Sequence, residues 1–516
     1  ATSDPSSPLA ANPGERLRTI AVLPFDNFSP NADDAYFAAG ITEEITGQLA
    51  RIGDLTVLSR TAVERAVESG ADLEELAREL GAGSVLEGSV RMAGPRVRIS
   101  AQLIEMDSQE NLWSDNFDRE LDDIFQIQTD VAMAIGEALL AELSSGERQR
   151  IETAATDNIR AYQLYLKQQG LFGSVPEQNR EAIDLLEQAL ALDPAYAEAW
   201  ARLSWRHTWQ ARLTGKRAEA ERAEQLALKA LEQNPELAVG HYALASALGM
   251  LERSDEAGAA FDRAYALDPN AESTLSDASI HYATHGQPAA GLEMAFHGVR
   301  INPNDPNQRW HAFMPLLFLG DAERMEAWLR LARDEGLEMH RLDSAEAELA
   351  LVRGNPDQAA ALARALRERY PDTREAQVMA NQLLFLTGNT AEAGDTLVAL
   401  GRDAPEAFAI NHFAPRSLRT LTGYVLAERG EETAARRAFD ESLEAVEQAV
   451  AQGSTWQGRA LDAASIHAFR GDHEAALQEL EWAYELGFRA DFALAFDPFF
   501  ASLREDPRFL ALLERI

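Results

Sequence analysis

The chain has 516 residues, of which 46% are hydrophobic and 25% charged, as in an ordinary folded protein of several domains. It has 84 Asp and Glu against 47 Lys and Arg, a formal net charge of −37. Nucleic-acid and anionic-membrane binders use clustered cations, so we expect neither partner and regard a cationic one as better matched. The absence of cysteine excludes disulfides, thiol nucleophiles and cysteine-ligated metals, and no apolar run could span a bilayer.

The first part of the chain is predicted to be a small α/β domain at residues 19–145, preceded by a flexible linker rich in Ser and Pro at residues 1–18. Short apolar runs predict strands, and three- and four-residue apolar spacing predicts helices. The expected elements are a strand at 19–25, a polar loop at 26–34, a helix at 41–52, a strand at 55–59 and an interrupted helical stretch at 61–80.

Two alternating strands and a long helix complete this predicted domain. The alternation covers residues 86–92 and 97–103, and the turn signal Ala-Gly-Pro-Arg at 93–96 makes the pair a hairpin. Apolar residues from Ile124 to Leu143 recur at helical spacing. The order strand-helix-strand-helix-strand-strand-helix predicts a mixed sheet.

From residue 160 onward an internal period replaces the strand signals. Prolines recur at steps of 34, 34, 68 and 34 residues, at positions 235, 269, 303, 371 and 405. A 34-residue period predicts stacked helical hairpins of the tetratricopeptide type, with small residues such as Ala257 and Gly291 where the two helices cross. We expect about nine units over residues 160–490 and an aromatic-rich capping segment at 491–516, so the second domain is an all-α superhelix.

Two family resemblances follow from these blocks. The second part resembles the tetratricopeptide-repeat superfamily. The first resembles the TolB-like N-terminal domain, which is similar to the FlgO family. The matching stretches are Ile20–Asn27, Tyr36–Ile45, Leu80–Val90, Arg96–Leu103, Leu112–Ser114 and Ile124–Ile127.

The resemblance implies an extracytoplasmic region. In proteins with this layout the pair of domains usually follows a membrane helix, which is preceded by an adenylate cyclase, winged-helix or kinase domain. The resemblance carries over no catalytic residue and no cofactor, so we expect a non-enzymatic chain. A stand-alone periplasmic or secreted protein stays open as well.

The search for catalytic and metal motifs returns none of the usual signatures. Gly81-Ala-Gly83 lies after a helix and before a strand, which favours a tight turn over a nucleotide site. The loop at 26–34 is expected to be solvated, with calcium as the one ion worth testing there. His281 and His285 have the i, i+4 spacing of metal ligands but no third ligand, so surface or packing roles are favoured and no metal is predicted.

One constellation indicates partner binding. In tetratricopeptide stacks, certain positions of each first helix line a concave groove, and here they hold aromatic and Met residues suited to an apolar peptide or helix. The alternative is that these side chains pack inside the stack. The candidate groove residues are Trp205, Trp209, Tyr242, Met250, Trp310, Met314 and Phe318.

Three hypotheses follow. The first is a protein-interaction scaffold that docks a protein or peptide. The second is the sensory region of a membrane-bound adenylate cyclase or transcription regulator, and the third is a self-assembling structural protein with open-ended head-to-tail contacts. A homo-oligomer is compatible with each of them.

Overall fold

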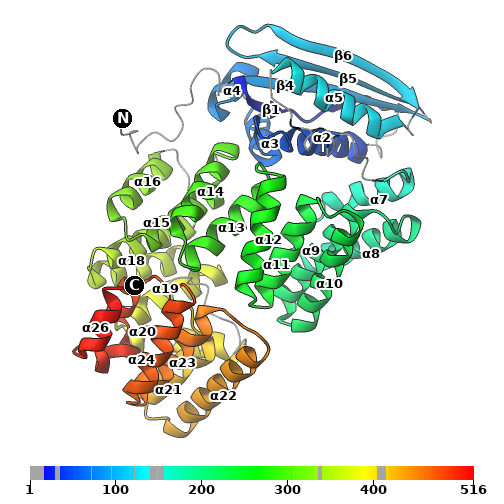
Figure 1. The fold of residues 1–516 in the computed structure, drawn as a ribbon. Helices are drawn as coiled ribbons and strands as arrows, with labels where there is room; N and C mark the ends of the chain where they lie inside the picture. Colours follow the sequence, from blue (N-terminus) through cyan, green and yellow to red (C-terminus); the bar gives the residue numbers. More distant parts are fainter. Residues whose placement is uncertain are drawn as a thin grey trace.

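The computed structural model describes residues 17–29, 35–70, 72–94, 96–120, 123–139, 144, 148, 151, 156–303, 305–334, 340–403 and 414–516. Most of the predicted linker, Asp33, Asp34, the end of the helix predicted to reach Leu143, and Pro405 lie outside these residues. Within them, an α/β domain lies against one side of a long, curved stack of helices (Figure 1). The predicted fold class, α/β followed by an all-α repeat superhelix, is confirmed.

The N-terminal domain is built on a mixed sheet. Its strands are β1 (Thr19–Val22), β2 (Asp26–Asn27), β3 (Thr56–Val57), β4 (Ser84–Ala93), β5 (Arg96–Glu105) and β6 (Asn111–Glu120). The order is β3-β1-β4-β5-β6, with β2 paired to β4. The pairs β1–β3, β1–β4 and β2–β4 are parallel, whereas β4–β5 and β5–β6 are antiparallel, as expected for the predicted hairpin.

The predicted order of elements lacked β2 and β6. β6 is the edge strand and has a partner on one side only, so most of its residues stay exposed and polar. Its sequence, Asn-Leu-Trp-Ser-Asp-Asn-Phe-Asp-Arg-Glu, therefore lacks the alternation that marks a half-buried strand. The structure corrects the prediction to six strands in the described residues.

Four helices cover the two faces of the sheet: α2 (Ala35–Ala50), α3 (Arg60–Glu68), α4 (Leu73–Leu80) and α5 (Ile124–Ala138). Apolar residues of α2 and α5 form one buried cluster with β1, β4 and β5, and those of α3 and α4 form another with the opposite face. Gly81 ends α4 in the left-handed conformation (φ 69°), which confirms the predicted tight turn after this helix.

The rest of the described chain consists of helices in antiparallel pairs and a terminal cap. They are α7 (Ile159–Gln169), α8 (Pro176–Leu192), α9 (Ala197–Thr214), α10 (Arg217–Gln233), α11 (Ala238–Met250), α12 (Ser254–Leu267), α13 (Glu272–Thr284), α14 (Pro288–Ile301), α15 (Pro306–Phe318), α16 (Ala322–Asp334), α17 (His340–Val352), α18 (Pro356–Arg369), α19 (Arg374–Leu386), α20 (Thr390–Asp403), α21 (Leu418–Glu428), α22 (Glu432–Ala451), α23 (Gln457–Phe469), α24 (His473–Glu485), α25 (Asp491–Phe496), the 3-10 helix η3 (Pro498–Leu503) and α26 (Pro507–Leu513).

Small residues let the two helices of a pair approach each other. A Cβ atom at Gly291 would lie 2.5 Å from the backbone oxygen of Ser279 on the partner helix. The predicted small residues Ala257 and Ala264 are likewise fully buried. This confirms the packing reason for the small-residue positions.

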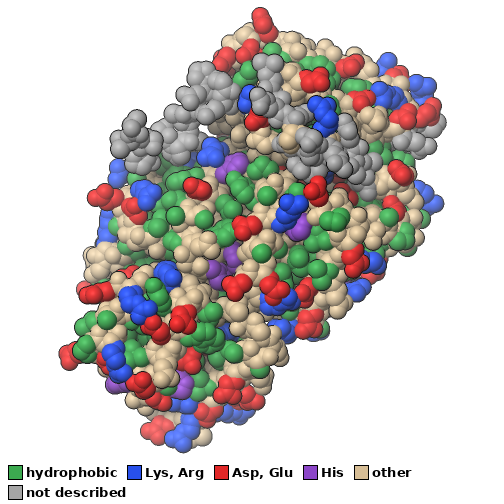
Figure 2. Space-filling view, viewed as in Figure 1, with side chains coloured by type: hydrophobic (Ala, Val, Ile, Leu, Met, Phe, Trp, Pro, Cys, Tyr) green, Lys and Arg blue, Asp and Glu red, His purple; other side chains and the backbone are tan. Residues whose placement is uncertain are grey.

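Successive repeats are also joined by ion pairs at the repeat distance. Arg341–Glu375 and Arg508–Glu474 each join residues 34 apart, with N–O distances of 2.6 and 2.7 Å. Acidic and basic side chains are interspersed over the visible face (Figure 2). A large part of the arginine content therefore serves to pair acids within a strongly acidic chain.

The N-terminal domain is held against the edge of the stack. A Cβ atom at Gly40 in α2 would lie 2.5 Å from Leu166 Cδ1 in α7, so glycine permits this close approach. The buried Asn270 Nδ2 donates to the backbone oxygens of Ala50 (3.0 Å) and Leu55 (2.9 Å). Contacts thus extend from the first repeat helix to the turn between α12 and α13. None of the described helices is both long and apolar enough to cross a membrane.

Candidate partner-binding surfaces

The predicted groove residues do not form one open surface. Trp310, Met314 and Phe318 all lie on α15 and are buried. Tyr242 on α11 is buried too, and its hydroxyl donates to the Asp277 carboxylate at 3.0 Å. The structure therefore corrects the expectation that these four side chains are exposed in a groove.

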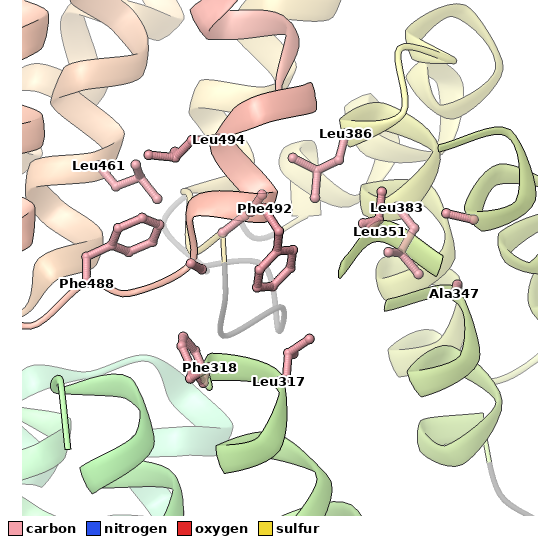
Figure 3. Close-up of a cluster of buried hydrophobic side chains, with 14 of the residues drawn as sticks. Leu317, Phe318, Ala347, Leu351, Leu383, Leu386, Leu461, Phe488, Phe492 and Leu494 are labelled. Carbon is pink, nitrogen blue, oxygen red and sulfur yellow. The ribbon is translucent and has the colours of Figure 1, made fainter. Parts of the chain in front are cut away.

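The chain's own C-terminal segment covers α15. Figure 3 shows Leu317 and Phe318 directed toward Phe488 and Phe492, which lie just before and within α25. Residues of α17, α19 and α23 complete this buried cluster. An apolar surface of the repeat stack is thus filled from within the molecule, and this burial is what removes it from contact with a partner.

Polar contacts join the same two ends of the stack. Arg459 at the start of α23 forms two hydrogen bonds with the Glu252 carboxylate, Nη2–Oε1 at 2.6 Å and Nε–Oε2 at 3.0 Å. Ser454 Oγ donates to Glu252 Oε2 at 2.7 Å, and the Thr455 amide donates to the Glu252 backbone oxygen at 2.8 Å. We call this contact between the α11–α12 turn and the 454–459 segment the closure seam. It makes the repeat stack a closed curve.

Glu252 itself occupies an unusual backbone position. Its φ of 61° lies in the left-handed region, which costs a side-chain-bearing residue about 1–2 kcal/mol. The equivalent turns 34, 68, 102 and 136 residues later all have glycine with positive φ, at positions 286, 320, 354 and 388. A glutamate therefore stands where the repeat otherwise uses glycine, and its carboxylate holds the closure seam.

The C-terminal cap is fixed by a buried ion pair. Arg416 Nη2 lies 2.5 Å from Asp497 Oδ2, and both side chains are almost fully buried. The Arg416 guanidinium also donates to Ser465 Oγ at 2.6 Å and lies over the Phe499 and Phe500 rings. Burial raises the pKa of Asp497 against the lowering effect of Arg416. Removing one partner would leave a buried charge, so this pair anchors the cap.

The remaining predicted groove residues are partly exposed. Trp205 and Trp209 on α9 meet edge to face, with ring centroids 5.9 Å apart, and line a cleft of about 280 Å³. We call it the tryptophan cleft; its other walls include Arg60, Phe172, Arg202 and Arg206. Met250 lies apart from it, in a cavity of about 490 Å³ between the α9–α10 turn and α22.

The histidine pair packs inside the repeats. His281 and His285 stack with ring centroids 4.3 Å apart, and burial is the main cause that lowers the pKa of His281, to about 3, and that of His285. The His285 Nδ1 atom lies 2.7 Å from the His281 backbone oxygen. Across the described ranges, no group of three or more His, Asp or Glu side chains is placed to hold a metal ion.

Two important residues escaped the sequence interpretation. Arg206 was not singled out because its position looks like any other charged residue on a helix. Glu252 did leave a signal, since it interrupts the series of glycines spaced by 34 residues. Neither its left-handed backbone nor its partner more than 200 residues away could be deduced from that interruption.

A 34-residue period of stacked antiparallel helix pairs defines the second domain as a tetratricopeptide-repeat superhelix. No protein-family model matches the chain. A protein of Rhizobium meliloti (strain 1021) named "Putative adenylate cyclase 3" is 36% identical over 263 residues, which are 48% of this chain and 44% of that protein. The chain thus spans less than half the length of this curated relative.

Solved structures with a similar course of the chain are of low identity. PilF of Pseudomonas aeruginosa is 21% identical with a TM-score of 0.34, over 42% of this chain and 96% of that one. A tetratricopeptide repeat protein of Parabacteroides merdae is 14% identical with a TM-score of 0.38, over 48% and 93%. YrrB, titled a tetratricopeptide protein with an unusual peptide-binding site, is 18% identical with a TM-score of 0.29, over 37% and 95%.

Proposed function

We propose that this chain is a non-enzymatic scaffold that docks a protein or peptide on its repeat superhelix. The observation that carries the proposal is the tryptophan cleft, where two Trp side chains remain partly exposed on α9 while the apolar residues of α15 are buried. Aromatic residues in a concave site are typical anchors for a partner. Trp205, Trp209 and Met250 are the predicted groove residues that a partner can reach without opening the closure seam.

The partner and its compartment follow from charge and resemblance. The net charge of −37 favours a partner that is cationic and disfavours nucleic acid. The N-terminal domain, with its resemblance to TolB-like domains, supplies a second contact or assembly surface. That resemblance supports an extracytoplasmic location, tethered in some proteins by an upstream membrane helix.

A second candidate function is the sensory or regulatory region of a membrane-bound adenylate cyclase. The 36% identity to a protein with that name favours it over a transcription regulator. In this case the catalytic domain belongs to another part of a longer polypeptide, and the scaffold reading of the repeats still applies.

Site-specific photo-cross-linking in the native cells tests the scaffold proposal. A photoreactive phenylalanine analogue replaces Phe172, which is 68% exposed at the cleft, and in a control chain replaces Leu510, which is 47% exposed on the cap helix α26. We expect one defined heterologous adduct from position 172 and not from 510. No adduct from position 172 contradicts docking at the cleft, and an adduct of twice the chain's mass assigns the surface to self-assembly.

Cell fractionation with intact-mass measurement tests the second candidate. A membrane-bound polypeptide that includes this sequence behind a membrane helix and a cyclase domain supports the sensory region. A free chain that begins at or near Ala1 contradicts it.

A further inference from the structure

The tryptophan cleft contains a buried cation whose hydrogen-bonding capacity is only partly used. Arg206 is 2% exposed, and its Nη2 donates to the backbone oxygen (2.9 Å) and to Oε1 (3.0 Å) of Gln168. Its Nε and Nη1 atoms have no hydrogen-bond partner among the described residues. The Nε atom of the neighbouring Arg202 is also buried without a partner. Two guanidinium groups therefore present unused donors at one place.

Unpaired cations are unexpected in this chain. With 84 acidic residues available, other arginines such as Arg253 and Arg459 form close pairs with carboxylates. Arg206 forms no ion pair with any residue that the structure describes. Burial and, secondarily, the charge of Arg202 lower the pKa of Arg206 to about 10. Desolvating a charge without a counter-charge is costly, so the site is electrostatically incomplete.

The other charged groups that line the cleft do not complete it. Glu43 of the N-terminal domain is the one acid among the lining residues, and its Oε2 is 3.2 Å from Arg60 Nη1. Arg60 in turn pairs with Glu64 at 2.7 Å. Three guanidinium groups and one carboxylate thus line the cleft, which is locally positive within a chain of strongly negative net charge.

The walls beside these cations are aromatic. Trp205 lies under the Arg206 guanidinium, whose Cζ is 5.1 Å from the ring centroid. Trp209 is held by the backbone of Gly173, where an added Cβ would lie 2.6 Å from Trp209 Cδ1. Phe172 stands exposed among the lining residues. A ligand that reaches the guanidinium groups must therefore place an apolar group against the indoles.

We propose that the tryptophan cleft binds a small organic acid, with its carboxylate on Arg206 and Arg202 and its apolar or aromatic group between Trp205, Trp209 and Phe172. Guanidinium groups match the planar, two-oxygen geometry of a carboxylate. A volume of about 280 Å³ is at the low end of the range for ligand pockets and suits a molecule of one ring and a short acidic chain. The site lies where the N-terminal domain meets the repeats, so it needs both domains.

This inference goes beyond partner docking and does not depend on it. The test uses the whole purified chain, without any partner, and isothermal titration calorimetry. The probes are 3-phenylpropionate and its uncharged analogue 3-phenylpropanamide. We expect the acid to bind at least tenfold more tightly than the amide, because only the acid supplies the missing charge. Equal affinities, or no binding of the acid below 10 mM, overturn the proposal.

Two variants locate the site. Arg206→Met removes the guanidinium and should weaken binding of the acid at least tenfold while leaving the weak binding of the amide unchanged. The matched control is Arg212→Met, which removes an arginine from the same helix that lies over Trp209 but outside the cleft. An equal loss in both variants, or none in Arg206→Met, contradicts the proposed site. If Arg206→Met fails to fold, Gly173→Ala serves instead, since it displaces Trp209 while keeping both guanidinium groups.

A last pair of probes separates a small acid from the end of a polypeptide. The peptide Gly-Ser-Ala-Gly-Ala-Phe is titrated with a free C-terminal carboxylate and as its C-terminal amide. Weaker binding of the free peptide than of 3-phenylpropionate supports a small-acid site. Binding of the free peptide tenfold more tightly than the small acid overturns it in favour of a peptide site. Because no partner is present, either result is independent of the cross-linking outcome.

Discussion

Replacing Arg459 by Met should loosen the closure seam by a measurable amount. Arg459 makes two hydrogen bonds to the Glu252 carboxylate, and the two side chains are only 16% and 19% exposed. Hydrogen bonds to charged groups contribute about 1.5–3 kcal/mol each in net terms. Water that enters the opened seam, and the partial exposure of the pair, reduce the expected total to about 2 kcal/mol. At 1.36 kcal/mol per factor of ten, the opening equilibrium shifts about 30-fold.

Native-state hydrogen exchange measures this shift at the seam itself. The Thr455 amide donates to the Glu252 backbone oxygen and the Ser254 amide donates to Thr455 Oγ at 3.0 Å, so both amides report its opening. We expect their protection to fall about 30-fold in Arg459→Met. Arg470→Met is the control, because Arg470 pairs with Asp440 at 2.6 Å away from the seam. A change below threefold, or an equal change in the control, would refute the reasoning.

The variant Glu252→Gly separates backbone strain from the side-chain contact. It restores the glycine found at the equivalent turns and relieves the left-handed backbone by about 1–2 kcal/mol. It also removes the carboxylate that Arg459 binds. If that ion pair holds the seam, protection of the Thr455 amide falls even though the turn becomes less strained. Protection that rises instead would show that the backbone, and not the ion pair, limits closure.

The remaining predictions concern packing and titration. Gly291→Ala should lower the unfolding free energy by about 1–3 kcal/mol in chemical denaturation, whereas Gly249→Ala, whose added Cβ meets nothing within 4 Å, should not lower it. Because the pKa of His281 is lowered to about 3, mainly by burial and further by His285, its contribution to stability is complete above pH 6.5 and is lost as the pH falls toward 3; His281→Phe should flatten this acid limb of the thermal midpoint. Burial raises the pKa of Glu348 to about 8, so its contribution is complete below about pH 4.5 and is lost as the pH rises through 8. Glu348→Gln should therefore match the parent at pH 4 and exceed its thermal midpoint at pH 9.

The periodic part of the fold could be predicted because each repeat states its own packing. Positions such as Ala257 and Gly291 need small residues wherever two helices cross, and this requirement recurs with every repeat. A strand at the edge of a sheet makes no such demand. β6 is mostly exposed and polar, so its ten residues carry no pattern that separates a strand from a loop.

The groove prediction was wrong for α15 because local sequence does not encode how far a superhelix curves. Phe318 meets Phe488 and Phe492 only because about five further helix pairs bring the cap back to α15. An apolar side chain waiting for a partner and one covered by the same chain look alike in sequence. The same limit applies to Arg206, whose missing counter-charge is visible only once its surroundings are placed.

The closure seam also decides where regulation of docking can act. The α15 surface is filled by the cap, and the cap is tied to the repeats by Arg416–Asp497 inside the cluster and by Glu252–Arg459 at the seam. A partner that sought the α15 surface would have to break the seam and expose several Phe and Leu side chains, each worth about 1.5–3 kcal/mol of burial. The tryptophan cleft requires no such rearrangement. A ligand bound there touches the N-terminal domain through Arg60 and Glu43 and the repeats through Trp205, so it can bias the junction between the two domains while the stack stays closed.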